Sequence, residues 1–166
     1  MKQIIEVGMG GSRIANSPDV LYAKYLEPCV AIGVLDKERK KGYMYHNVDV
    51  FQEDLDEFLM LAFQNASPTN LRAYVTGNSA RSSDSKEYRE EIHGLRDTVH
   101  SVADCYFPVS QREYHWLPDD SWGTLAVDTE SGNMSSQSHK AGDDRRELKL
   151  EIFSLNPKNP YRFNTK

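Results

Sequence analysis

Apolar residues along this chain form short runs separated by polar turns, and this pattern predicts several strands. The run Val-Ala-Ile-Gly-Val-Leu over 30–35 is unbroken, which is typical of a strand buried on both faces. After a charged turn at 36–41 the chain returns through a second apolar run, so these two runs predict a hairpin. The apolar runs of this N-terminal part lie at 2–7, 20–26, 30–35 and 42–46.

Two longer segments repeat apolar residues every three or four positions, the spacing of a helix that buries one face. The first helix is expected to be capped by Asp49, with Gln52 completing a capping box. The second is expected to be capped by Asp84 with Glu87 and to end before Pro108. The apolar positions are Phe51, Leu55, Phe58, Leu59 and Ala62 in the first helix, and Tyr88, Ile92, Leu95, Val99, Val102 and Tyr106 in the second.

The other segments complete an α+β pattern. Two polar segments, 8–16 and 135–146, are expected to be loops. We expect mixed or antiparallel β layers covered by two main helices, in a single domain over 1–155 followed by a tail at 156–166. Further strands are expected at 71–75, 112–117, 123–128 and 148–152.

Charge and hydropathy narrow the choice of partners. The net charge is −5 over 166 residues, and binding to a nucleic acid backbone needs a clustered basic surface. No apolar run approaches the roughly 18–20 residues of a membrane span, and the first residues alternate with charges, unlike a secretion signal. We therefore expect a cytoplasmic protein with no nucleic acid partner and no membrane insertion; delivery as an effector leaves no mark in the sequence.

The two cysteines, Cys29 and Cys105, lie far apart and form no CxxC motif. No histidine follows either of them at zinc spacing, so no metal site is expected. Without a secretion signal, reduced thiols are the expected state. Cys105 borders the apolar face of the second predicted helix, which favours a packing role. Four histidines, at positions 93, 100, 115 and 139, are interpreted as solvated.

Cys29 and His46 are the candidate reactive pair. If the turn of the predicted hairpin is centred near residue 38, Cys29 lies opposite His46 at its open end. A cysteine nucleophile needs a base to form the thiolate and an acid for the leaving group, and one imidazole can serve as both. A cysteine beside a strand is also a common packing residue, so the residues alone leave both interpretations open.

The segments around this pair resemble a known family. Leu-Glu-Pro-Cys-Val-Ala-Ile-Gly-Val-Leu-Asp over 26–36, followed by Gly-Tyr-Met-Tyr-His over 42–46, is similar to the motif of the CheD chemoreceptor glutamine deamidases. That family also places its histidine about seventeen residues after its cysteine. The segments 75–80 and 123–133 resemble its Gly-Gly-Ala loop and its late strand with the following turn. The resemblance implies a layered sandwich that shares the catalytic fold of toxins of the cytotoxic necrotizing factor type.

The resemblance also implies an activity, the hydrolysis of a glutamine side-chain amide to glutamate and ammonia on a partner protein. Cys29 would be the nucleophile, His46 the general base and acid, and the Val30 backbone an oxyanion donor. No cofactor is implied. The side chains expected to contact the substrate or a signalling partner are Glu27, Asn78 and Ser79. The sequence does not define the substrate or the oligomeric state.

Two departures from the family pattern open an alternative. Glu27 and Pro28 replace Gly-Ser before the cysteine, and the Glu27 carboxylate is expected to raise the pKa of the thiol. Ala23 replaces a threonine that orients the imidazole, which leaves Tyr25 or Tyr22 as the candidate substitute. The alternative is a catalytically weakened CheD-like binding module that acts in signalling or chemotaxis.

Overall fold

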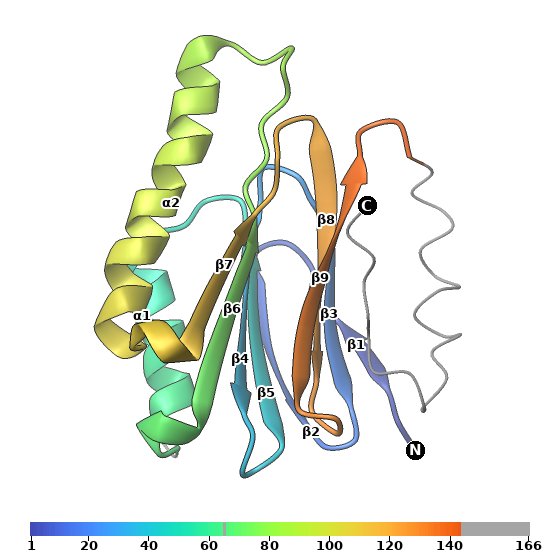
Figure 1. Cartoon of the computed structure of the whole chain (residues 1–166), viewed down its shortest axis with the longest axis vertical. Helices are drawn as coiled ribbons and strands as arrows, with labels where there is room; N and C mark the ends of the chain where they lie inside the picture. Colours follow the sequence, from blue (N-terminus) through green and yellow to red (C-terminus); the bar gives the residue numbers. More distant parts are fainter. Residues whose placement is uncertain (65, 144–166) are drawn as a thin grey trace.

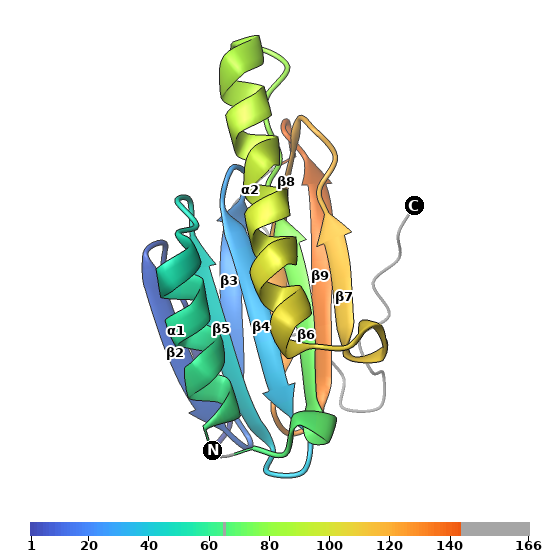
Figure 2. The ribbon, with the colours of Figure 1, turned by 90° about the vertical axis from the view of Figure 1, so that its left-hand side faces the viewer.

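The structure, a computed structural model, describes residues 1–64 and 66–143. It has three layers: two helices, a five-stranded sheet and a four-stranded sheet (Figure 1). The helices α1 (Gln52–Phe63) and α2 (Lys86–Tyr106) lie side by side on one face of the five-stranded sheet (Figure 2). The predicted α+β layered sandwich with two main helices is confirmed.

The five-stranded sheet carries the hairpin of the candidate pair. Its order is β2 (Gly11–Asn16), β5 (Lys41–Asn47), β4 (Val30–Asp36), β6 (Leu71–Gly77) and β7 (Arg112–Trp116). All its pairings are antiparallel except that of β6 with β7. The four-stranded sheet has the order β1 (Ile4–Glu6), β3 (Val20–Leu26), β8 (Ser121–Asp128) and β9 (Asn133–Lys140). Short 3₁₀ turns at Pro68–Asn70 and Val109–Gln111 precede β6 and β7.

Two buried layers hold the molecule together, and the five-stranded sheet separates them. The helix-side core lies under α1 and α2, and the inter-sheet layer lies between the two sheets. Because side chains of a strand alternate between faces, β4 supplies both layers. The helix-side core includes Val30, Ile32, Val34, Tyr43, Tyr45, Leu55, Leu59 and Val99, and the inter-sheet layer includes Leu21, Ala23, Cys29, Ala31, Leu35, Met44, Leu125 and Val127.

Two segments expected to be loops are strands. Residues 11–16 form β2, which pairs with β5, and residues 133–140 form β9, which pairs with β8. Both lie at the edge of a sheet, so most of their side chains stay at least partly exposed and polar. Backbone pairing, rather than an apolar pattern, makes them strands.

The helix starts also differ from the expected ones. Phe51 precedes α1 without a side-chain capping bond, so Asp49 and Gln52 form no capping box, and Phe51 is 59% exposed instead of buried. The α2 helix is capped by Ser85, whose hydroxyl oxygen accepts the Tyr88 N–H at 3.2 Å. The expected strand at 148–152, the tail and the domain boundary at 155 lie outside the described residues. No helix of the described part is long and apolar enough to cross a membrane.

Candidate functional site

The hairpin of β4 and β5 brings Cys29 and His46 to the same face of the sheet, in a register two residues from the expected one. His46 lies opposite Ala31, and Val30 lies opposite Asn47. The turn spans residues 37–40, because the Asp36 carboxylate accepts the N–H groups of the turn and Lys40 takes a left-handed φ of 51°. Side chains alternate with period two, so a two-residue offset makes Cys29 and His46 diagonal neighbours on one face.

The His46 imidazole is held in one orientation inside the inter-sheet layer. Its Nδ1 lies 2.9 Å from the carbonyl oxygen of Val7, which immediately follows β1. A carbonyl oxygen only accepts hydrogen bonds, so Nδ1 carries the proton and Nε2 presents its lone pair. Burial lowers the pKa of His46, which favours the neutral ring. The imidazole is therefore a base with a fixed tautomer.

Nothing in the described part of the chain uses the second nitrogen of this ring. His46 is 4% exposed, and its Nε2 is buried without a hydrogen-bond partner among the described residues. Buried polar atoms are nearly always paired, so an unpaired one requires an explanation. Nε2 is thus an unused acceptor on the same face of the sheet as the Cys29 thiol.

Cys29 is a buried thiol, 5% exposed. Burial first, and then the charges of Glu27 and Asp49, raise the pKa of Cys29 to about 11. Across the described residues, no hydrogen bond joins its Sγ to His46. At neutral pH the resting state is therefore a protonated thiol beside a neutral imidazole, and the expectation that Glu27 raises the thiol pKa is met.

The backbone at Cys29 packs tightly against the end of β6. The Asn78 N–H donates to the Cys29 carbonyl at 2.8 Å. Gly77 has a φ of 107°, and a Cβ there would lie 2.1 Å from the Cys29 carbonyl oxygen, so only glycine fits. Tyr25 and Asn78 take left-handed φ values of 59° and 60°. Such conformations cost about 1–3 kcal/mol each and cluster at functional sites.

The three side chains expected to contact a partner are buried and bonded internally. Glu27 accepts two 2.8 Å hydrogen bonds from Arg81, and Ser79 donates to the Pro118 carbonyl at 2.8 Å. Asn78 donates to the Ile92 carbonyl on α2. These groups fix the segments around Cys29 instead of presenting polar atoms to a partner. A pocket of about 250 Å³ lies outside Glu27 and Pro28.

The structure does not bring Tyr25 or the Val30 N–H to the expected roles. The Tyr25 ring packs against Trp122, with 5.7 Å between ring centroids, and the Val7 carbonyl orients the imidazole instead. Successive residues of an antiparallel ladder direct their backbone groups to opposite neighbours. The Cys29 carbonyl accepts a hydrogen bond from Asn78, at the end of β6, so the Val30 N–H points the other way, toward Asn47 on β5. There it belongs to the hydrogen-bond ladder between β4 and β5.

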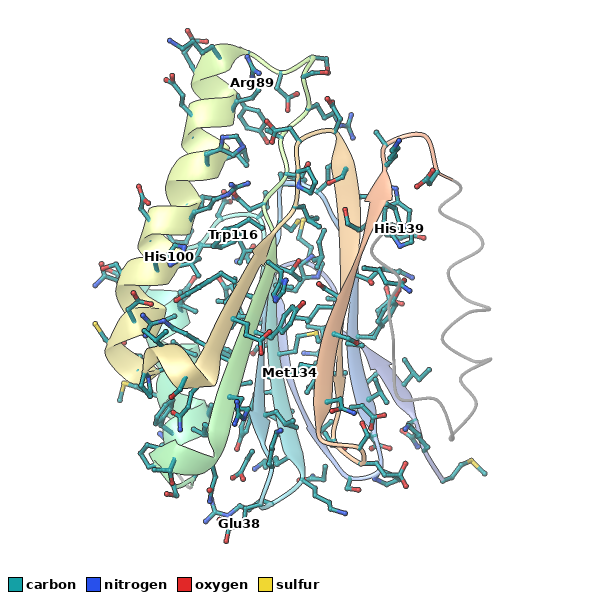
Figure 3. All side chains as sticks on the ribbon, viewed as in Figure 1. Glu38, Arg89, His100, Trp116, Met134 and His139 are labelled. Carbon is teal, nitrogen blue, oxygen red and sulfur yellow. The ribbon has the colours of Figure 1, made fainter. Side chains whose placement is uncertain are left out.

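Val7 is the site residue that the sequence did not reveal, and it acts through its backbone, which no side-chain pattern marks. Other expectations for single residues also change. Cys105 is exposed, and its thiol donates to the Ser101 carbonyl at 3.2 Å. His100 accepts the Trp116 indole N–H at 3.2 Å between α2 and β7 (Figure 3), so it is a packed residue.

Metal and disulfide chemistry have no visible site in the described part. Cys29 and Cys105 are both free thiols. Residues 1–64 and 66–143 contain no group of three or more His, Cys, Asp or Glu side chains that can hold a metal ion.

Comparison with known proteins gives a distant structural likeness. No protein family and no curated protein matches the chain. A solved structure, the hypothetical protein YfiH of Bacillus licheniformis, is similar over 63% of this chain at 10% identity, with a TM-score of 0.43. The aligned part spans about half, 49%, of that protein. A likeness this distant carries no argument about function.

Proposed function

We propose that this protein is a cysteine-dependent hydrolase of side-chain amides, a protein-glutamine deamidase, with Cys29 as nucleophile and His46 as base and acid. The observation that carries the proposal is the unpartnered Nε2 of His46. It is buried, its lone pair is fixed by the Val7 hydrogen bond, and it lies on the same sheet face as a buried thiol. The choice of glutamine as substrate comes from the CheD resemblance of residues 26–46.

The reaction consists of two displacements at one carbonyl carbon. His46 Nε2 takes the thiol proton, Cys29 Sγ bonds to the carboxamide carbon, and the C–N bond breaks as His46 gives that proton to the leaving NH2 group, which departs as ammonia. His46 then takes a proton from water, the hydroxide attacks the thioester carbon, and the C–S bond breaks. Cys29 recovers its proton, and the glutamine has become a glutamate.

The resting geometry requires an activation step. Diagonal neighbours across two strands lie about 7–8 Å apart, which is too far for a direct hydrogen bond. Catalytic hydrogen bonds often shorten only in the substrate complex. Binding of the substrate chain beside Glu27 and Pro28 turns the Cys29 side chain toward Nε2 and removes water, and the thiolate then forms against the imidazolium.

The direct test is ammonia release from a glutamine-rich protein such as casein, with the mass gain of about 1 Da per deamidation read by mass spectrometry. We expect the wild type and Cys105→Ser, which removes the exposed thiol, to be active. Cys29→Ser and His46→Gln should lose about a thousandfold or more. Turnover that survives Cys29→Ser with unchanged folding would contradict the proposal.

A binding module without turnover is the second candidate, and one observation favours it. The pKa of Cys29 is raised to about 11, the opposite of an activated nucleophile. A substrate-like electrophile, a peptide in which a chloromethyl ketone replaces the carboxamide of glutamine, separates the two candidates in the Cys105→Ser background. A hydrolase should react with it at Cys29 at least about tenfold more slowly after His46→Gln, because substrate binding brings the thiol to the base. A binding module should react equally slowly with and without the imidazole.

A further inference from the structure

A groove lined by α1, β5 and the start of β2 lies at the outer edge of the five-stranded sheet. Figure 2 shows that α1 lies over this sheet near its edge strand β2. Its volume is about 620 Å³. The α1 helix packs over β5 and leaves the neighbouring β2 uncovered, so Tyr45 and Phe58 lie beneath the groove and Ser12 lines its edge. The Tyr45 and Phe58 rings pack 5.6 Å apart, which gives the groove an aromatic floor.

The wall formed by α1 is acidic. Residues 42–71 contain five carboxylates and no lysine or arginine. Glu53, Asp54 and Glu57 line the groove, are exposed, and form no ion pair with any described residue. Leu61 and Met60 line it further along and are 41% and 51% exposed. The wall therefore offers unneutralised negative charge beside apolar surface.

The opposite side of the groove is formed by Gly11 and Ser12, at the start of the edge strand β2. Among the described strands, β2 pairs only with β5. Alternate residues of an edge strand direct their N–H and C=O groups outward, and an extended peptide can pair with them. Ser12 and Ile14 share the helix-side face, because they lie opposite Tyr45 and Tyr43 in the register. An added strand would thus run along α1.

We propose that this groove binds an extended segment of a partner protein in which basic residues alternate with apolar ones. The basic side chains pair with Asp54 and Glu57, the apolar ones cover Leu61 and the aromatic floor, and the backbone pairs with β2. The charge of the groove selects the occupant, since this acidic surface repels an acidic segment.

The groove ends near the backbone of His46, on the opposite face of the sheet from the His46 and Cys29 side chains. Gly10, Gly11 and Asn47 line that end. Gly11 lies opposite His46 in the register, and the Gly10 N–H donates to the His46 carbonyl at 2.8 Å. A segment bound along β2 therefore continues toward the end of the hairpin where Cys29 lies. Binding of the segment to the groove is independent of the proposed function. Only the further step, that this segment belongs to the substrate, rests on the proposed function.

The experiment measures binding of a fluorescent peptide, four Lys-Val repeats, to the full chain by anisotropy. A Glu-Val peptide with the same apolar content is the matched control. We expect only the Lys-Val peptide to bind, and added salt to weaken it. Asp54→Asn with Glu57→Gln should weaken binding about fivefold. Glu87→Gln with Glu91→Gln, which removes two exposed charges from α2, should leave it unchanged.

Each of the following outcomes overturns the proposal: equal binding of both peptides, equal weakening by both charge pairs, or a dimer of this chain that Asp54→Asn with Glu57→Gln dissociates. N-methylation of alternate peptide residues tests the strand pairing, and unchanged affinity for both methylated registers also overturns it. Cys29→Ser separates this proposal from the deamidase. Peptide binding without ammonia release refutes only the deamidase, and ammonia release without peptide binding refutes only the groove.

Discussion

The two faces of the five-stranded sheet differ in the size and chemistry of their side chains. On β4 the face toward the helices carries Val30 and Ile32, whereas the face toward the second sheet carries Cys29, Ala31 and Gly33. The inter-sheet layer contains the buried imidazole of His46, and on β4 its side chains are smaller than those facing the helices.

The apolar side chains that stabilise the fold and the candidate reactive pair therefore lie on opposite faces of the sheet. β-Branched side chains of β4 pack against leucine and aromatic side chains under the helices, and this apolar burial stabilises the fold. Small residues on the other face let the second sheet approach closely, so a Cβ on Gly33 would lie 2.6 Å from a Val127 methyl group. Close packing of this kind holds the His46 ring in its orientation. Both the thiol and the imidazole lie in this layer.

The largest expected loss of stability comes from a substitution in the helix-side core. Leu59 on α1 is fully buried in the helix-side core. Leu59→Ala removes its packing and leaves a cavity, which should lower the free energy of unfolding by about 3 kcal/mol in urea titrations. Cys29 labelling by iodoacetamide in the native state should not change, because the inter-sheet layer is untouched.

Leu61→Ala on the same helix is the matched control. Leu61 is 41% exposed, so its loss should cost less than about 1 kcal/mol. Equal costs for Leu59 and Leu61, or faster labelling of Cys29 in native Leu59→Ala, would show that the two buried layers are not separate.

The elements inside the molecule were predictable from sequence, and the elements at its edges were not. The run over 30–35 and the helical spacing of Leu55, Leu59 and Val99 reflect burial, which determines the residue types directly. The edge strands β2 and β9 bury little, so their sequences carry no apolar pattern. Ser85 was missed as the cap of α2 because Asp84, its neighbour, fits the same role.

The site was predictable as a pair of residues but not in its geometry. The run of apolar residues identified the hairpin, yet its register depended on the turn at 37–40, where Lys40 takes a left-handed φ. The orientation of His46 depends on the Val7 carbonyl, a contact between residues 39 positions apart. Backbone partners at this distance follow from tertiary packing, which no local pattern encodes.

A smaller loss of stability is expected from enlarging a side chain in the inter-sheet layer. Gly33→Ala forces its new Cβ against Val127, and overpacking of this kind should cost about 2 kcal/mol. Adding Val127→Ala should recover part of the loss, because it removes the opposing methyl groups. Gly94→Ala in α2, where nothing lies within 4 Å of the new Cβ, should stabilise the protein by about 0.5–1 kcal/mol. A Gly33→Ala protein as stable as Gly94→Ala would show that the sheets separate easily.

The smallest expected effect is a pH dependence that belongs to the inter-sheet layer alone. Burial lowers the pKa of His46 below its ordinary value of 6.5, so the folded ring stays neutral where the unfolded ring takes a proton. The contribution of His46 to stability is therefore complete above about pH 6.5 and is lost as pH falls through the lowered pKa. Urea titrations of wild type and His46→Gln between about pH 7 and pH 5 should show a steeper loss for the wild type. Parallel curves would mean that the imidazole accepts a proton in place, and the neutral, unpaired Nε2 on which the proposed chemistry depends would then be wrong.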